Sequence, residues 1–194
     1  MRRLTLIFFC LSLASLLQGC IAAGAAVGVG CAGASVITDR RSFHTMDMDL
    51  SIEHKARQQI NANCVLARST HIVIQSYNGV VLIAGETPTE DMRNQVDQIV
   101  KSNPDVRRVF NMITIQNPIS LYQISKDATI AANVKTRFIA TTNISANHFT
   151  VVVENKVVYL MGLNSHSQTD AAAEVASNST GVKKVVKLVE YINC

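Results

Sequence analysis

The sequence predicts an α+β protein made of two copies of one αββαβ unit, each with a three-stranded mixed sheet and two helices on one face of that sheet. The first observation is an internal repeat, because Asn78–Gly85 and Asn155–Gly162 match at a constant offset. The second observation is a shared order of patterns: a helical period, two β-branched runs around a turn, a helical period and a last apolar run. Each copy has about 65 residues, near the lower size limit for an independent core.

Each copy opens with an amphipathic helix, over Ser51–Ala62 in the first copy and Lys126–Phe138 in the second. Ile130, Val134 and Phe138 recur every four residues, which predicts the buried side of a helix. The two strands that follow are expected at His71–Ser76 and Val80–Gly85 in the first copy, and at Phe149–Glu154 and Val157–Gly162 in the second.

A tight turn joins these two strands in each copy. Asn78-Gly79 between β-branched runs is a strong signal for a two-residue hairpin. The second copy has Asn155-Lys156, where asparagine tolerates the left-handed backbone conformation. Pro88 and Glu90 predict the start of the next helix. We expect the second helices over Glu90–Ser102 and Gln168–Asn178, and the last strands over Val106–Ile115 and Val182–Ile192.

The first twenty residues have the pattern of an export signal. Arg2 and Arg3 supply a positive segment, and the apolar run Leu4–Leu17 is too short to span a bilayer comfortably. Gly19 followed by Cys20 resembles the lipobox of bacterial lipoproteins, in which the cysteine carries lipid and becomes the mature N-terminus. We expect a covalent diacylglyceryl and N-acyl (palmitate) lipid on Cys20; the alternative is an ordinary signal peptide in which Cys20 has no role.

The chain therefore divides into five parts. We expect a signal peptide over residues 1–19, a lipidated cysteine with a Gly/Ala-rich tether over 20–50, a first domain over 51–116, a linker over 117–124 and a second domain over 125–193. Removal of Arg2 and Arg3 with the leader lowers the net charge from +4 to +2. That charge is too small for nucleic-acid binding driven by backbone electrostatics.

Motifs for catalysis or for a metal are missing from the sequence. The five histidines, His44, His54, His71, His148 and His166, show no metal-ligand spacing, and no nucleophile elbow or phosphate-binding loop occurs. Cys64 has no nearby histidine and is expected to be a small core residue. We therefore expect a non-enzymatic protein without catalytic residues, metal or cofactor.

Both copies resemble the BON domain (bacterial OsmY and nodulation). The resemblance rests on the apolar strand that ends in glycine, Val80–Gly85 and Val157–Gly162, and on the entry into the last strand, Gly181–Val185. The first copy has Pro104-Asp105-Val106 where the family usually has Gly-Val, which is a mild departure. Two such copies behind a lipidated cysteine resemble one group of BON proteins, the outer-membrane lipoproteins with two BON domains.

The resemblance implies a lipid-anchored protein on the periplasmic face of the outer membrane. Ile21 after Cys20 is consistent with this, because an aspartate there typically retains a lipoprotein in the inner membrane. The second BON domain would bind anionic phospholipids such as phosphatidylglycerol and support envelope integrity. Association with division sites and with the outer-membrane protein assembly machinery is also implied, and nucleic acid is not an expected partner.

The lipid-binding face implied by the family is the first helix of the second domain. On a helical wheel Ala132, Lys135, Thr136 and Ile139 point away from the core, with Arg137 toward the edge of this face. A cation for the phosphate and an apolar residue for the acyl boundary are what an interfacial helix needs. One departure is that the group commonly has an aromatic residue near the helix start, where this chain has Thr129.

Two other functions remain open. One is a protein-interaction adaptor in outer-membrane protein assembly or envelope stress, with no lipid recognition beyond the anchor. The other is a chaperone-like stress protein similar to the soluble periplasmic members of the family, against which Cys20 argues. A purely structural role is equally open for the two residues: Lys135 would be a solvated charge and Ile139 a partly buried neighbour of the core.

Overall fold

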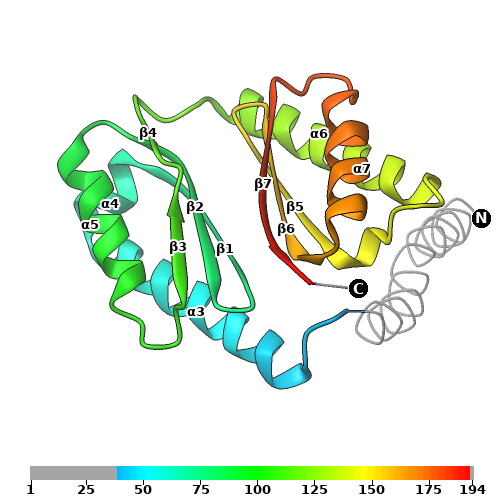
Figure 1. Ribbon diagram of the computed structural model, residues 1–194. Helices are drawn as coiled ribbons and strands as arrows, with labels where there is room; N and C mark the ends of the chain where they lie inside the picture. The colour runs from blue at the N-terminus through cyan, green and yellow to red at the C-terminus, as the bar shows by residue number, and fades with distance from the viewer. Residues whose placement is uncertain (1–38, 193–194) are drawn as a thin grey trace, which may run out of the picture. The chain divides into compact units, whose positions relative to one another are not determined.

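The computed structural model describes residues 39–192 (Figure 1). The expected signal peptide, Cys20, Cys31, most of the tether and Cys194 lie outside the described residues. From Arg40 onward the described chain belongs to one compact unit. It contains two successive copies of the predicted αββαβ order.

The first copy carries one extra short helix and a divided last strand. The helices and strands are α3 (Phe43–Ala62), α4 (Cys64–Ser69), β1 (His71–Tyr77), β2 (Val80–Thr87), α5 (Glu90–Lys101), β3 (Arg108–Asn111) and β4 (Thr114–Ile115). The last strand is divided because the side-chain carbonyl of Asn111 accepts a hydrogen bond from the N–H of Ile113 (3.2 Å). This local bond competes with the regular strand ladder.

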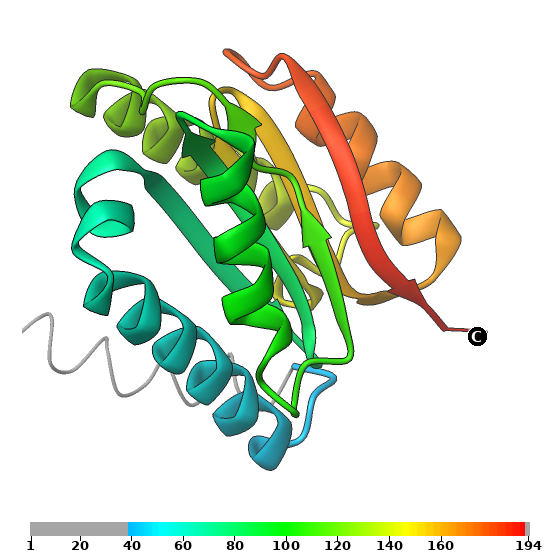
Figure 2. The same cartoon turned by 90° about the vertical axis from the view of Figure 1, so that its left-hand side faces the viewer.

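The second copy is more regular. Its elements are α6 (Leu121–Ala140), the 3₁₀ turn η1 (Ala146–His148), β5 (Phe149–Glu154), β6 (Val157–Asn164), α7 (His166–Ser177) and β7 (Lys184–Tyr191). In both sheets the second strand is central: it pairs antiparallel with the first strand and parallel with the last. The predicted α+β class and mixed sheets are confirmed. Figure 2 shows α3 and α5 together on one face of the first sheet.

Both long helices begin earlier than the sequence patterns indicate. Ser42 and Ser120 cap α3 and α6, each accepting a hydrogen bond from the N–H three residues on. Residues 43–50, expected as tether, and residues 121–124, expected as linker, are therefore helical. Half of the residues in the first turn of each helix are exposed, so these turns lie outside the buried apolar pattern that predicts the rest of the helix.

The two hairpins have the predicted left-handed turns. Asn78 and Gly79 have φ of 55° and 71°, and Asn155 and Lys156 have φ of 46° and 65°. Both turns are fixed by a buried aspartate of the preceding long helix. Asp49 accepts hydrogen bonds from the N–H groups of Asn78 (2.7 Å) and Gly79 (2.8 Å).

Three apolar clusters make up the interior. One lies between α3, α5 and the first sheet, and a second lies between α6, α7 and the second sheet. The third joins the helix-free faces of the two sheets, because it contains residues of both copies: Tyr77, Val80, Leu82, Ala84, Val152, Tyr159, Met161 and Leu188. All eight residues of β2 are buried, since both faces of this central strand are covered.

Candidate membrane-binding face

Helix α6 packs its predicted apolar side against the second sheet. Ile130, Val134 and Phe138 are almost completely buried, and the Phe138 ring meets that of Phe149 edge to face at 5.7 Å. These contacts hold α6 in a fixed orientation. The opposite side of the helix, which the sequence analysis assigned to lipid, therefore faces solvent.

The solvent-facing side of α6 forms one continuous stripe. We call it the outer face of α6 and define it by Leu121, Tyr122, Ala128, Ala132, Lys135 and Ile139, all of which are exposed. Leu121 and Ile139 point in the same direction, because eighteen residues make five full helical turns. Their side chains are 84% and 76% exposed, so large apolar groups lie in water at both ends of the helix.

The exposed charge of α6 is exclusively positive. Lys126 and Lys135 are exposed, whereas Asp127, the sole acidic residue of α6, is buried. Asp127 accepts hydrogen bonds from the N–H groups of Asn155 and Lys156, both at 2.9 Å, and so serves the hairpin turn. The exposed surface of α6 thus combines apolar side chains with ammonium groups, and no carboxylate of the helix opposes them.

Two of the predicted lipid-binding residues are already engaged within the domain. The Arg137 guanidinium donates hydrogen bonds to the carbonyl oxygen of Asn178 and, at 3.3 Å, to the hydroxyl of Ser179. The Thr136 hydroxyl donates to the carbonyl oxygen of Ala132 (2.9 Å). Arg137 therefore caps the end of α7, and Lys135 is the better placed of the two cations for a partner outside the chain.

The structure adds an aromatic residue that the sequence analysis assigned to the linker. Tyr122, in the first turn of α6, is 69% exposed, and the ammonium of Lys126 lies 4.4 Å from its ring centroid. Tyr122 lies seven residues before Thr129 and points to nearly the same side of the helix. The N-cap signal of Ser120 would have revealed this extra turn.

Shallow hollows flank α6 at both ends. One of about 220 Å³ is lined by Lys135, Phe138, Ile139, Ala146, Asn147 and Phe149. Another of about 330 Å³ is lined by Lys126, Thr129, Ile130, Lys156 and Gly181. Each hollow places lysine next to apolar side chains, a combination that suits a phosphate group attached to a hydrocarbon chain.

Other residues singled out in the sequence have different surroundings. Cys64 is exposed at the first position of α4, so the expectation of a small core residue is wrong; the Asn63 cap starts a new helix there and turns the thiol outward. On the last strand, Lys187 pairs with Asp170 at 2.6 Å. Within residues 39–192, no helix has the length and apolar character needed to cross a membrane.

Comparisons with known proteins identify both repeats. Residues 49–117 and 126–193 each match the BON domain. The outer membrane lipoprotein DolP of Haemophilus influenzae is 34% identical over 177 residues, which cover 91% of each chain. The 21 kDa hemolysin of Actinobacillus pleuropneumoniae is 32% identical over 154 residues, which cover 79% of each chain.

Solved structures give a weaker likeness. CdsD, a structural protein of the type III secretion system of Chlamydia trachomatis, aligns over 73% of this chain and 92% of its own, with 10% identity and a TM-score of 0.32. At this level of similarity no functional conclusion is transferred.

Proposed function

Because the chain belongs to the BON domain family and is similar over nearly its whole length to an outer membrane lipoprotein, we propose that it is a non-enzymatic outer-membrane lipoprotein that binds anionic phospholipid through α6. Cys20 is the proposed lipidation site, and the periplasmic face of the outer membrane is the proposed location. The observation that carries the proposal is the outer face of α6, which is apolar at both ends and has no exposed carboxylate.

The expected free energy of the contact between α6 and the membrane is small, but with the lipid anchor it suffices to hold α6 at the surface. One lysine near an anionic surface contributes about 1 kcal/mol. Burial of an Ile or Leu side chain contributes about 1.5–3 kcal/mol. Lipid on Cys20 would hold the domain at the surface, and tethering raises its effective concentration there, so α6 need not bind tightly by itself. The proposed role of α6 is to recognise anionic lipid and to orient the domain on the membrane. In this way the protein would support envelope integrity and act at division sites.

Vesicle co-sedimentation tests this proposal. The soluble fragment 40–194, which contains all three apolar clusters, is mixed with vesicles of neutral lipid or of neutral lipid plus phosphatidylglycerol. We expect binding that requires the anionic lipid and weakens with salt, because screening reduces the contribution of exposed lysines. In Lys135→Glu/Ile139→Asp we expect about a tenfold loss or more, since one favourable charge and one apolar anchor are both reversed.

The first domain supplies a control for the same chemical changes. Leu50 and Lys55 are exposed on α3, which occupies the same place in the first copy as α6 in the second. The variant Lys55→Glu/Leu50→Asp should retain binding within about twofold, because these positions lie on the other domain. Equal losses in both double variants would show a general charge effect. Unchanged binding by the folded α6 variant would move the proposal to the protein-interaction adaptor in outer-membrane protein assembly.

A further inference from the structure

Three side chains with metal-ligand chemistry meet where the two sheets pack together. His71 begins β1, Glu86 lies near the end of β2, and Glu154 ends β5 in the second domain. Each offers one ligand atom, and these atoms all lie within 4.8 Å of one another. His71 Nε2 and Glu154 Oε2 are 3.3 Å apart.

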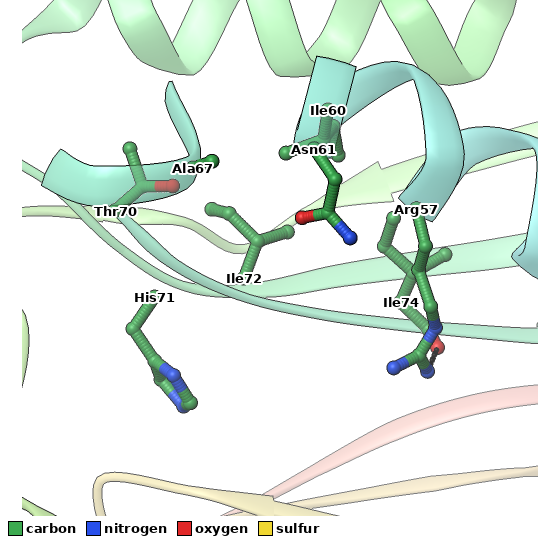
Figure 3. A pocket seen from close by; sticks show the side chains of 8 residues that line it. All are labelled: Arg57, Ile60, Asn61, Ala67, Thr70, His71, Ile72 and Ile74. Atoms are coloured by element: carbon green, nitrogen blue, oxygen red, sulfur yellow. Dashed lines mark hydrogen bonds between the residues drawn. The ribbon is translucent and has the colours of Figure 1, made fainter. Parts of the chain in front are cut away.

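Two of the three side chains are neighbours because of the strand pairing. His71 and Glu86 are direct partners in the β1–β2 ladder, so both side chains leave the same face of the first sheet. Figure 3 shows the His71 ring directed away from the Ile72 and Asn61 side chains, to the other side of the strand. Glu86 is oriented by the N–H of Ile119, which donates to its Oε2 at 3.3 Å.

The two glutamates of the site are almost completely buried. Glu86 and Glu154 are 1% and 6% exposed. No lysine or arginine among residues 39–192 forms an ion pair with either glutamate. Glu154 Oε1 has no hydrogen-bond partner within that part of the chain, although it is buried. A buried carboxylate oxygen without a partner is costly, and a bound cation would remove that cost.

We propose that His71, Glu86 and Glu154 bind one divalent transition-metal ion, with Zn²⁺ as the best-fitting ion, and that this ion joins the two BON domains. One imidazole and two carboxylates neutralise a doubly charged ion, and imidazole with carboxylate suits zinc. Bonds of about 2.0–2.1 Å in tetrahedral geometry require ligand atoms roughly 3.4 Å apart. The His71–Glu154 separation already meets this, and a fourth position remains for water.

Burial, which is the largest cause, and the nearby carboxylates of Glu86 and Asp127 together raise the pKa of Glu154 to about 8.

Calorimetric titration of the chelator-treated, full-length protein in detergent with ZnCl₂ tests the site. We expect one Zn²⁺ per chain and a higher melting temperature with zinc, because an ion that binds the folded chain alone stabilises it. His71→Gln and Glu154→Gln should each weaken binding by about tenfold or more, as loss of a ligand costs at least as much as loss of a supporting group. Mg²⁺ should not produce the same shift, since it prefers oxygen ligands in octahedral geometry.

The matched controls are His54→Gln and Cys64→Ser, which change exposed candidate ligands on the first domain. Both should retain zinc binding. Binding that survives in His71→Gln, that disappears in Cys64→Ser, or that is missing from the wild type would overturn the proposal. The melting temperature without zinc shows whether each variant is folded, and His71, which is partly exposed, is the substitution the fold tolerates best.

Discussion

A single aspartate in each repeat organises the hairpin that follows it. Asp49 and Asp127 are 2% and 3% exposed, and each receives two backbone N–H groups from its turn. Asp49 also accepts from the Ser76 hydroxyl (2.6 Å) and from Arg41 (2.8 Å). The turn residues have positive φ, so these bonds offset a conformation that non-glycine residues adopt at a cost.

Replacement of Asp127 should therefore destabilise the second domain strongly. Asp127→Ala should lower the free energy of unfolding by several kcal/mol, since each hydrogen bond to a charged group contributes about 1.5–3 kcal/mol. Urea unfolding followed by circular dichroism measures the change. Asp47→Ala, at an exposed position on α3, serves as the control and should change stability by about 0.5 kcal/mol at most.

Glu154 predicts an unusual pH dependence of stability. Its pKa in the folded state is about 8 and its ordinary value is 4.5, so the folded chain binds the proton more tightly than the unfolded chain. The stabilisation is therefore complete below about pH 4.5 and is lost as the pH rises through about 8. With chelator present, the unfolding free energy of the wild type should fall between about pH 5 and pH 8.5 relative to that of Glu154→Gln. Parallel curves for the two proteins would contradict the raised pKa.

At the scale of elements, the central strands need glycine at a position that the family pattern already marks. A Cβ atom at Gly85 would lie 2.0 Å from the carbonyl oxygen of His71, and one at Gly162 would lie 2.3 Å from that of His148. The backbone at the start of β1 and at the end of η1 therefore approaches these glycines too closely for any side chain. The sequence shows these glycines as strand ends, whereas β2 and β6 continue for two residues beyond them.

The second hairpin carries strain that substitution can relieve. Lys156 has φ of 65°, where the first repeat has Gly79. Lys156→Gly should raise the unfolding free energy by about 1 kcal/mol, because the left-handed conformation costs an L-residue roughly 1–2 kcal/mol. The higher unfolded-state entropy of glycine offsets only part of this gain. Thermal unfolding measures this, and Lys184→Gly, in an exposed strand position, should be destabilising instead.

At the scale of the whole molecule, the two BON domains share an apolar cluster, and through it the stability of each domain depends on the other. Leu82 and Met161 are completely buried in this cluster, which contains residues of both domains. Arg107 of the first domain and Glu190 of the second form an ion pair at 2.9 Å beside it. The exposed pair contributes about 1 kcal/mol at most, so the apolar contact supplies most of the interaction.

This coupling predicts that a change in one domain loosens the other. Met161→Ala should cost about 2–5 kcal/mol, and hydrogen exchange should become faster in β2 of the first domain as well as in the second sheet. Val134→Ala, a truncation in the second domain's own core, is the control and should affect the second domain alone. Faster exchange confined to β5–β7 in Met161→Ala would contradict the coupling.

The sequence by itself determined the local order of this protein: two αββαβ copies, their turns, their core-facing helix residues and the exposed Lys135 and Ile139. These features follow from periodicity, turn residues and the repeat, which are short-range properties. The hairpin register even pairs His71 with Glu86, because both lie equally far from the Asn78-Gly79 turn. The first turns of α3 and α6 were not predicted, because they lie outside the buried apolar pattern and only their serine N-caps mark them.

Only the tertiary structure decided which parts of the two copies meet. The helix-free faces of the sheets are apolar in both copies, but no sequence pattern states that they cover each other. Packing them together brings Glu154 of one domain to His71 and Glu86 of the other, across more than sixty residues of chain. The tertiary structure likewise shows that Arg137 is held by the end of α7 whereas Lys135 faces solvent. The physical reason is that burial and long-range proximity depend on how all the elements pack together. The hydrophobic period of a segment shows which of its sides is buried, but not which other segment covers that side.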